Sequence, residues 1–147
     1  MSGAQATGCS PIATAYEAET LNFVPQKPKT IARSLAIGNP ADGYYALKQM
    51  QETGGGAAMV TDDEIVEGIK LLAETTGIFT ETAGGVTVGV LQKLAERGEI
   101  GAGERVVVYL TGEGLKTLDA TRDTFQMHEI DPSLDSFEAE FRQEVAV

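Results

Sequence analysis

Short apolar runs alternate with helical patterns through the middle of this sequence, and this alternation constrains the fold more than any other feature. Three apolar runs have the length of buried strands: 57–60, 78–80 and 105–110. In two longer stretches the apolar residues have helical spacing, 61–77 and 82–97. Strand–helix–strand order is typical of parallel sheets, because strands that run the same way need a long crossover. The valine-rich run 105–110 suits a central strand covered on both faces. The pattern therefore predicts an α/β fold with a partial parallel sheet and flanking helices.

The helix predicted at residues 61–77 carries the clearest start and stop signals. Thr61 and Glu64 have the spacing of a capping box, in which each side chain accepts a bond from the other residue's backbone N–H. An apolar stripe starts at Ile65, and Gly77 suits the left-handed residue that ends many helices. Further helical patterns cover residues 10–19, 30–37 and 39–53, and two prolines mark residues 22–29 as a loop.

Residues 121–147 differ in composition from the rest of the sequence. They contain seven acidic and two basic residues. Leu134, Phe137, Phe141 and Val145 nevertheless share one helical face, which predicts an amphipathic helix that covers another surface. We therefore divide the chain into residues 1–120 and an acidic C-terminal extension, 121–147.

The predicted strands are fewer than the helices that need a sheet to pack on. A parallel sheet requires cover on both faces, and three short strands offer little area for that. The sequence alone thus indicates that this chain is part of something larger.

Charge and composition exclude several classes of partner. The formal net charge is −11, and the eleven basic residues are scattered, which argues against nucleic acid and against an anionic membrane surface. No stretch approaches the apolar length of a membrane-spanning helix. The single cysteine, Cys9, rules out an intrachain disulfide, and we expect a cytoplasmic protein.

Two loops stand where ligands gather in parallel sheets, at the carboxyl ends of predicted strands. Residues 81–85 follow the run 78–80, and residues 111–114 follow the run 105–110. Both loops combine small residues with a hydroxyl and a carboxylate. A plainer interpretation is that Glu81 and Thr82 only cap a helix and that Thr111 is an ordinary turn residue.

Other residues are weaker candidates for chemistry. His128 is the only histidine and lies in a polar stretch, which favours a surface position. Cys9 has no neighbouring base in sequence, which favours an inert buried thiol. The glycines 54–56 follow a helix rather than precede one, so they favour a flexible connection over a phosphate cradle. No metal-ligand spacing or Ser/His/Asp set is visible, and we expect no metal.

Four stretches carry a resemblance to a known family. They are A-Q-A-T-G-C-S-P-I within residues 3–12, S-L-A-I-G-N-P-A at 34–41, F-T-E-T-A-G-G-V-T at 79–87 and V-Y-L-T-G-E-G-L-K at 108–116. In order and spacing they resemble the threonine synthases, which are fold type II pyridoxal-phosphate enzymes. The resemblance covers roughly residues 3–120 and implies that they are the C-terminal part of such a catalytic domain.

The resemblance implies roles for particular residues. Thr111 would hydrogen-bond the pyridine nitrogen of pyridoxal 5'-phosphate, and Glu81, Thr82 and Ala83 would lie beside its ring. Asn39 would help to shape the substrate side. The complete enzymes convert O-phospho-L-homoserine and water to L-threonine and phosphate, in threonine biosynthesis.

The sequence departs from the family in what it lacks. The family's Schiff-base lysine and its cofactor-phosphate loop lie upstream of the region that this chain resembles, and none of the six lysines here has the family's Ser-Phe-Lys setting. We therefore expect no catalytic residue in this chain and no activity from it alone. Its expected partner is the missing N-terminal half or a full-length subunit, with a homo-oligomer also open.

Two alternatives stay open at this point. One is a fragment of a related fold type II enzyme, such as a cysteate synthase or a threonine dehydratase. The other is a non-catalytic module that binds a partner through an open sheet edge or through the acidic tail helix.

Overall fold

The computed structural model describes residues 1–125 and 128–141, and its regular elements are concentrated in the first of these ranges. In chain order they are β1 (Gly3–Ala6), α1 (Pro11–Glu17), η1 (Arg33–Leu35), α2 (Gly43–Glu52), β2 (Ala57–Val60), α3 (Asp62–Thr76), α4 (Thr82–Glu96), η2 (Gly114–Ala120) and α5 (Leu134–Phe141), where η marks a 3₁₀ helix.

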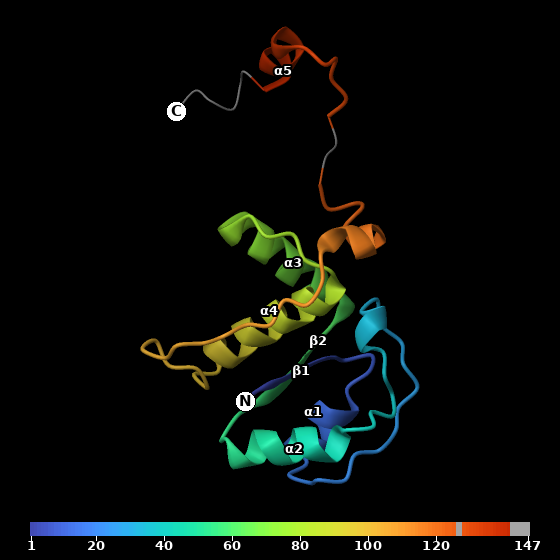
Figure 1. The fold of residues 1–147 in the computed structure, drawn as a ribbon, viewed down its shortest axis with the longest axis vertical. Coiled ribbons are helices and arrows are strands. Elements are labelled where there is room, and N and C mark those ends of the chain that lie inside the picture. Colours follow the sequence, from blue (N-terminus) through green and yellow to red (C-terminus); the bar gives the residue numbers. More distant parts are fainter. Residues whose placement is uncertain (126–127, 142–147) are drawn as a thin grey trace.

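A two-stranded parallel sheet lies between two helical layers. β1 pairs with β2 in the register Gly3↔Ala57 to Ala6↔Val60. Helix α4 covers one face with α3 packed beside it, and α1 and α2 cover the other face (Figure 1). The predicted α/β class with a partial parallel sheet and flanking helices is confirmed.

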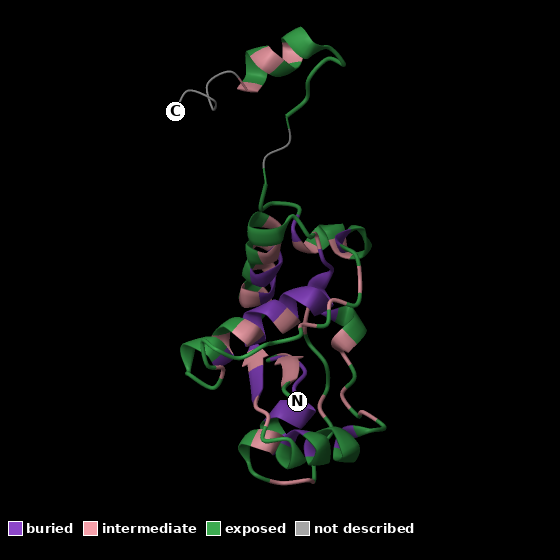
Figure 2. Ribbon diagram, turned by 60° about the vertical axis from the view of Figure 1, so that its left-hand side comes forward, coloured by how far each residue is buried: buried purple, intermediate pink, exposed green. Residues whose placement is uncertain are grey.

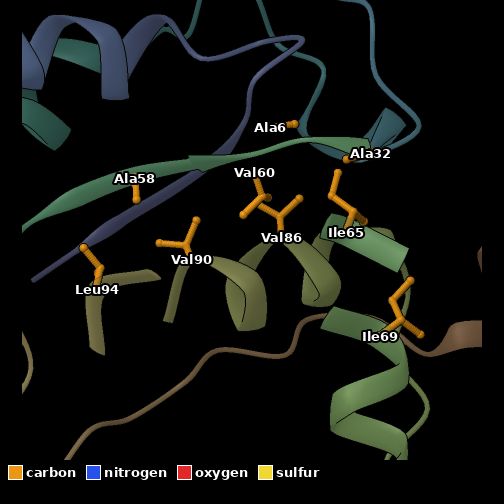
Figure 3. Packing of buried hydrophobic residues seen from close by; sticks show 9 residues of the cluster. All are labelled: Ala6, Ala32, Ala58, Val60, Ile65, Ile69, Val86, Val90 and Leu94. Carbon is orange, nitrogen blue, oxygen red and sulfur yellow. The ribbon is translucent and has the colours of Figure 1, made fainter. Parts of the chain in front are cut away.

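Side chains of the strands alternate between the two layers, as the pleat of a strand requires. Ala58 and Val60 join the cluster beneath α4, whereas Ala57 joins Ile12 and Leu47 of the α1–α2 layer. Figure 3 shows Val60 of β2 facing Val86 of α4, with Ile65 of α3 beside them. The remaining members of this main cluster are Ala6, Ala32, Ile69, Val90 and Leu94.

Two of the three predicted strands are wrong. Residues 78–80 form only an isolated antiparallel bridge, Thr80↔Glu113, and residues 105–110 have no regular secondary structure and pair with no described strand. Val107 and Tyr109 in the latter run are 74% and 78% exposed. Consecutive β-branched residues favour an extended backbone, but a strand also needs a neighbouring strand to hydrogen-bond with. The two described strands, β1 and β2, pair with each other and not with residues 105–110.

The predicted boundaries of α3 are confirmed. The Thr61 hydroxyl accepts a bond from the Glu64 N–H (3.2 Å), and the Glu64 carboxylate accepts one from the Thr61 N–H (2.7 Å), so the capping box is complete. Gly77 ends the helix in the left-handed region, at φ 73°. The Glu64 carboxylate also forms an ion pair with Lys93 of α4, with 2.7 Å between Oε1 and Nζ, and this pair links the two helices.

Glu64 should make the stability of the chain depend on pH. The hydrogen bond from Lys93 and the backbone bond at Thr61 hold the pKa of this carboxyl below its ordinary value of 4.5. The unfolded chain then binds more protons, so the contribution of Glu64 is present above about pH 4.5 and is lost as the pH falls through the lowered pKa. Urea titrations between pH 3 and 6 should show a shallower pH slope for Glu64→Gln than for the wild type. Glu74→Gln, on the exposed side of α3, is the matched control, and equal slopes for Glu64→Gln and wild type contradict the assignment.

Helices α3 and α4 approach closely because glycines line their contact. A Cβ placed at Gly68 would lie 2.5 Å from the carbonyl oxygen of Gly85. Gly89 similarly leaves room for Val60, whose Cγ1 would lie 3.0 Å from an added Cβ. As a result the N-terminal half of α4 is the most buried helix segment in the molecule (Figure 2).

The acidic extension contains α5, which spans Leu134–Phe141 of the predicted helix. Its apolar side chains Leu134 and Phe137 are exposed, and Val145 lies outside the described residues. The division of the chain at residue 120 stays a prediction. None of the helices within residues 1–125 and 128–141 is long and apolar enough to cross a membrane.

Candidate functional site

The two loops singled out in the sequence meet at the N-terminus of α4. The carbonyl oxygen of Gly112 accepts bonds from the Glu81 N–H (3.1 Å) and from the Thr80 hydroxyl (3.0 Å). The Gly114 N–H returns a bond to the carbonyl oxygen of Phe79 at 3.1 Å. Three hydrogen bonds thus lock together two segments whose paired residues lie 31 to 35 positions apart, although neither flanking run became a strand.

Glu81 is the most buried carboxylate of the site. The residue is 4% exposed, and its Oε2 lies 3.0 Å from the Nζ of Lys116. An added Cβ at Gly112 would overlap the Glu81 carboxylate, so only glycine lets the second loop approach this closely. Glu81 holds the N-cap position of α4, but its side chain makes no capping hydrogen bond. Capping therefore does not account for this carboxylate.

Thr82 and Ala83 begin α4 and are both buried. The Thr82 N–H donates to the Thr117 hydroxyl of η2 at 3.2 Å. The Thr82 hydroxyl oxygen is fully buried and has no hydrogen-bond partner among the residues that the structure describes. An unsatisfied buried hydroxyl costs roughly 1–3 kcal/mol, which is a cost that a bound polar group would remove.

Thr111 and Asn39 occupy more open positions. Thr111 is exposed and directly precedes Gly112, whose carbonyl oxygen joins the two loops. Asn39 is exposed in the turn after η1, where the neighbouring Gly38 carbonyl accepts a bond from the Gln26 N–H. No hydrogen bond or ion pair among the described residues links Asn39 to either loop, so the structure brings Glu81, Thr82, Ala83 and Thr111 together but not Asn39.

A cavity of about 340 Å³ opens beside the Glu81–Lys116 pair. Its other lining residues come from η2, from η1 and from Ile31 shortly before η1: Ile31, Arg33, Ser34, Thr117, Asp119 and Ala120. Five polar members were not predicted as site residues: Arg33, Ser34, Lys116, Thr117 and Asp119. Ser34 and Lys116 do lie within two of the motif stretches, which was the available signal, whereas nothing in the sequence pointed to Arg33, Thr117 or Asp119.

The structure gives no chemical role to the weaker candidates, Cys9, His128 and the glycines 54–56. Cys9 is buried, and desolvation raises the pKa of its thiol, which makes a reactive thiolate unfavourable. His128 pairs with Glu140 at 2.8 Å and packs on Phe141 within the acidic extension. Gly54 has a positive φ of 61° in the connection between α2 and β2. Within the described ranges no group of three or more metal-ligating side chains occurs.

Comparison with known proteins points to a single family. Residues 1–112 match the family described as pyridoxal-phosphate dependent enzyme. The chain is 46% identical over 121 residues to a threonine synthase of Methanocaldococcus jannaschii, which is 82% of this chain and 30% of that protein. It is 41% identical over 117 residues to a threonine synthase of Methanosarcina acetivorans (79% of this chain, 29% of that protein). A threonine synthase of Mycobacterium tuberculosis is 33% identical over 119 residues (81% and 31%). The chain thus spans about 30% of the length of the curated relatives it matches.

Proposed function

The chain belongs to the pyridoxal-phosphate dependent enzymes, and on that premise we propose that it forms one wall of the cofactor site of a threonine synthase. The proposed activity of the complete enzyme converts O-phospho-L-homoserine and water to L-threonine and phosphate. The observation that carries the proposal is the junction of the two motif loops, in which Gly112 accepts bonds from Thr80 and Glu81. We place this activity in the cytoplasm, which the single buried cysteine supports.

The residues at the junction fit the ring of pyridoxal phosphate. A pyridine nitrogen needs a hydrogen-bond partner, and the exposed Thr111 hydroxyl can supply one. Thr82 offers a buried hydroxyl with unused hydrogen-bonding capacity, and Ala83 offers a small apolar surface. Asn39 is proposed for the substrate side by resemblance alone.

Bound pyridoxal phosphate supplies an electron-withdrawing ring, and the protein sets how strongly that ring acts. A neutral threonine hydroxyl at the pyridine nitrogen makes the ring a milder electron sink than a carboxylate would. The nearly buried Glu81 carboxylate pairs with the Lys116 ammonium at 3.0 Å, and this contact links the first loop to η2, which continues from the second loop.

The residues do not fit the covalent attachment of the cofactor. Of the six lysines, all of which the structure describes, Lys116 is the one whose ammonium contacts a site loop, and there it is paired with Glu81. Lys48, Lys70 and Lys93 pair with acidic residues on the helices. We therefore propose that the attaching lysine and the phosphate cradle come from the part of a threonine synthase that this chain does not span.

Thr111→Val tests the wall directly in an assembled enzyme. The chain would be combined with a recombinant fragment of the M. jannaschii threonine synthase. This fragment contains the part of that enzyme to which the chain has no matching residues. Loss of one hydrogen bond to the pyridine nitrogen should weaken pyridoxal-phosphate affinity roughly 2- to 10-fold. Equilibrium titration of cofactor absorbance measures this affinity.

The matched control is Thr75→Val, on the exposed surface of α3, which should keep the wild-type affinity. Equal affinities for Thr111→Val and wild type would remove Thr111 from the proposed site. Turnover of L-threonine or L-serine in place of O-phospho-L-homoserine would redirect the proposal to a threonine dehydratase, one of the related fold type II enzymes.

A further inference from the structure

An apolar groove of about 400 Å³ lies between α3 and the segment that follows η2. Most of its inner surface is apolar, and the side chains that line it include Ile69, Ala73, Phe79, Leu118, Thr124 and Phe125. Leu118 and Phe125 are exposed, although both are large apolar side chains. The proposed cofactor wall does not use this groove, so its apolar surface needs another explanation.

Helix α5 carries an apolar stripe made of Leu134, Phe137 and Phe141. Leu134 and Phe137 are exposed, and the rings of Phe137 and Phe141 lie 4.9 Å apart on the same face of the helix. Figure 1 shows α5 apart from the sheet and its two helical layers. An isolated helix of eight residues is marginally stable in water, because most helical stability comes from packing of the apolar face. Helix α5 therefore gains stability from an apolar surface that it can reach.

The groove lies within reach of α5 of the same chain. Phe125 lines the groove, and eight residues, 126–133, connect it to Leu134. A connection of this length spans at most about 30 Å, whereas α5 is only about 12 Å long. Because the groove begins where the connection begins, the tether gives α5 an effective concentration on the order of millimolar. Separate molecules rarely reach that concentration, which favours the chain's own helix as the occupant.

We propose that α5 docks its apolar stripe in this groove, called here the tail groove, and acts as a strap over Phe79 and η2. Phe79 lines the tail groove, and its carbonyl oxygen accepts the Gly114 N–H at 3.1 Å where the two motif loops meet. The Phe79 ring also lies so close to Gly114 that an added Cβ would overlap it. Docking therefore covers the residue against which the second loop packs and should hold that loop in place. It requires neither cofactor nor substrate.

The charges of the two partners make this docking depend on salt. Residues 1–120 contain fifteen acidic and nine basic residues, and the extension contains seven and two. Both parts are therefore negative and repel each other at low ionic strength. Glu74 in the groove adds to this repulsion, and Lys70 is already paired with Glu67 at 3.2 Å. The screening length falls from about 30 Å at about 0.01 M salt to about 3 Å at about 1 M, so docking should strengthen as salt is added.

Tryptophan fluorescence of the full chain tests the tail groove, because the sequence contains no tryptophan. Phe125→Trp places a single probe in the groove. Between about 0.01 M and about 1 M salt its emission should move to shorter wavelength, since the docked helix excludes water from the indole ring. Phe137→Asp in the same background should abolish this shift. Ala139→Asp adds an equal charge on the opposite side of α5 and should preserve it.

Hydrogen exchange of the chain without the tryptophan gives a second measurement. At about 1 M salt the amides of Thr121 and Thr124, which lie at the groove, should exchange roughly 3- to 10-fold more slowly in the wild type than in Phe137→Asp. The Gly114 amide, which bonds Phe79, should show the same difference. Equal exchange at Gly114 would contradict the role of α5 as a strap.

An emission that does not respond to salt, or a shift that survives Phe137→Asp, overturns the proposal. A shift that grows with protein concentration would assign the groove to α5 of a second copy. In the complex with the M. jannaschii fragment, protection of Thr121 and Thr124 that no longer depends on Phe137 would assign it to the unmatched part. If Phe125→Trp does not fold, the exchange of the wild type and of Phe137→Asp decides the matter. None of these samples contains cofactor, so the tail groove and the cofactor wall fail separately.

Discussion

The isolated chain is expected to release no phosphate or threonine from O-phospho-L-homoserine with pyridoxal phosphate, whereas the chain combined with the complementary M. jannaschii fragment is expected to turn over. The reason is the distribution of lysines. Lys116 alone among the six contacts a site loop, and its ammonium is held 3.0 Å from the Glu81 carboxylate. A cofactor without a covalent lysine and a phosphate cradle is poorly oriented for catalysis.

A continuous assay of phosphate release and amino-acid analysis of the product measure the activity of both samples. The complex should be active, and the isolated chain should show no activity. Borohydride reduction followed by intact-mass measurement provides the control for cofactor attachment. No cofactor mass should be added to this chain, either alone or in the complex, and the added mass should be found on the complementary fragment. Attachment to Lys116 would contradict the assignment of the attaching lysine to the unmatched part.

Ile65→Ala is expected to produce the largest loss of stability of any single truncation considered. Ile65 is fully buried at the meeting point of α3, α4 and β2, where Val60 and Val86 pack around it (Figure 3). Removing a buried isoleucine side chain to Ala costs about 2–5 kcal/mol, a large part of the about 5–15 kcal/mol that stabilises an ordinary domain. Urea unfolding followed by circular dichroism measures the change.

Ile130→Ala is the matched control, since Ile130 is 40% exposed in the acidic extension. Its effect should lie within about 0.5 kcal/mol of zero, as for most exposed positions. Equal losses for the two variants would mean that the cluster around Ile65 is not the core that holds the layers together.

Local signals in the sequence predicted most of the helices well, although the helix predicted at residues 30–37 is wrong, since only the 3₁₀ helix η1 (Arg33–Leu35) forms there. The capping box at Thr61 and the glycine at 77 fix α3 through contacts within a few residues, so the sequence contains everything needed to infer them. The Ser10-Pro11 start of α1 and the apolar run of β2 are local in the same way. Helix α2 begins at Gly43, a few residues after the predicted start, because residues 39–42 form a turn first.

Strand pairing was predicted less well because it depends on distant partners. Residues 105–110 have strong β propensity, but no described strand pairs with them, and propensity alone does not make a strand. β1 was visible only through the resemblance at residues 3–12, since its small residues give no alternating pattern. The short run 78–80 was too brief to form more than one bridge.

The candidate site was predicted in outline and not in detail. The sequence singled out both loops, and the Gly112 bonds to Thr80 and Glu81 show that they meet, although the strands predicted before them did not form. The Glu81–Lys116 ion pair and the contribution of Arg33 to the cavity depend on how η1 and η2 fold over the loops. Such irregular segments lack the periodicity from which their position could be inferred.

The central claim is that residues around Glu81 and Thr111 form a wall of the pyridoxal-phosphate site. The most direct test is a ¹⁵N–¹H spectrum of the labelled chain in complex with the unlabelled M. jannaschii fragment, recorded before and after cofactor is added. Resonances of residues 80–83 and 111–114 should shift, while those of α5 at 134–141 should stay unchanged. Cofactor-induced shifts that bypass both loops would contradict the account.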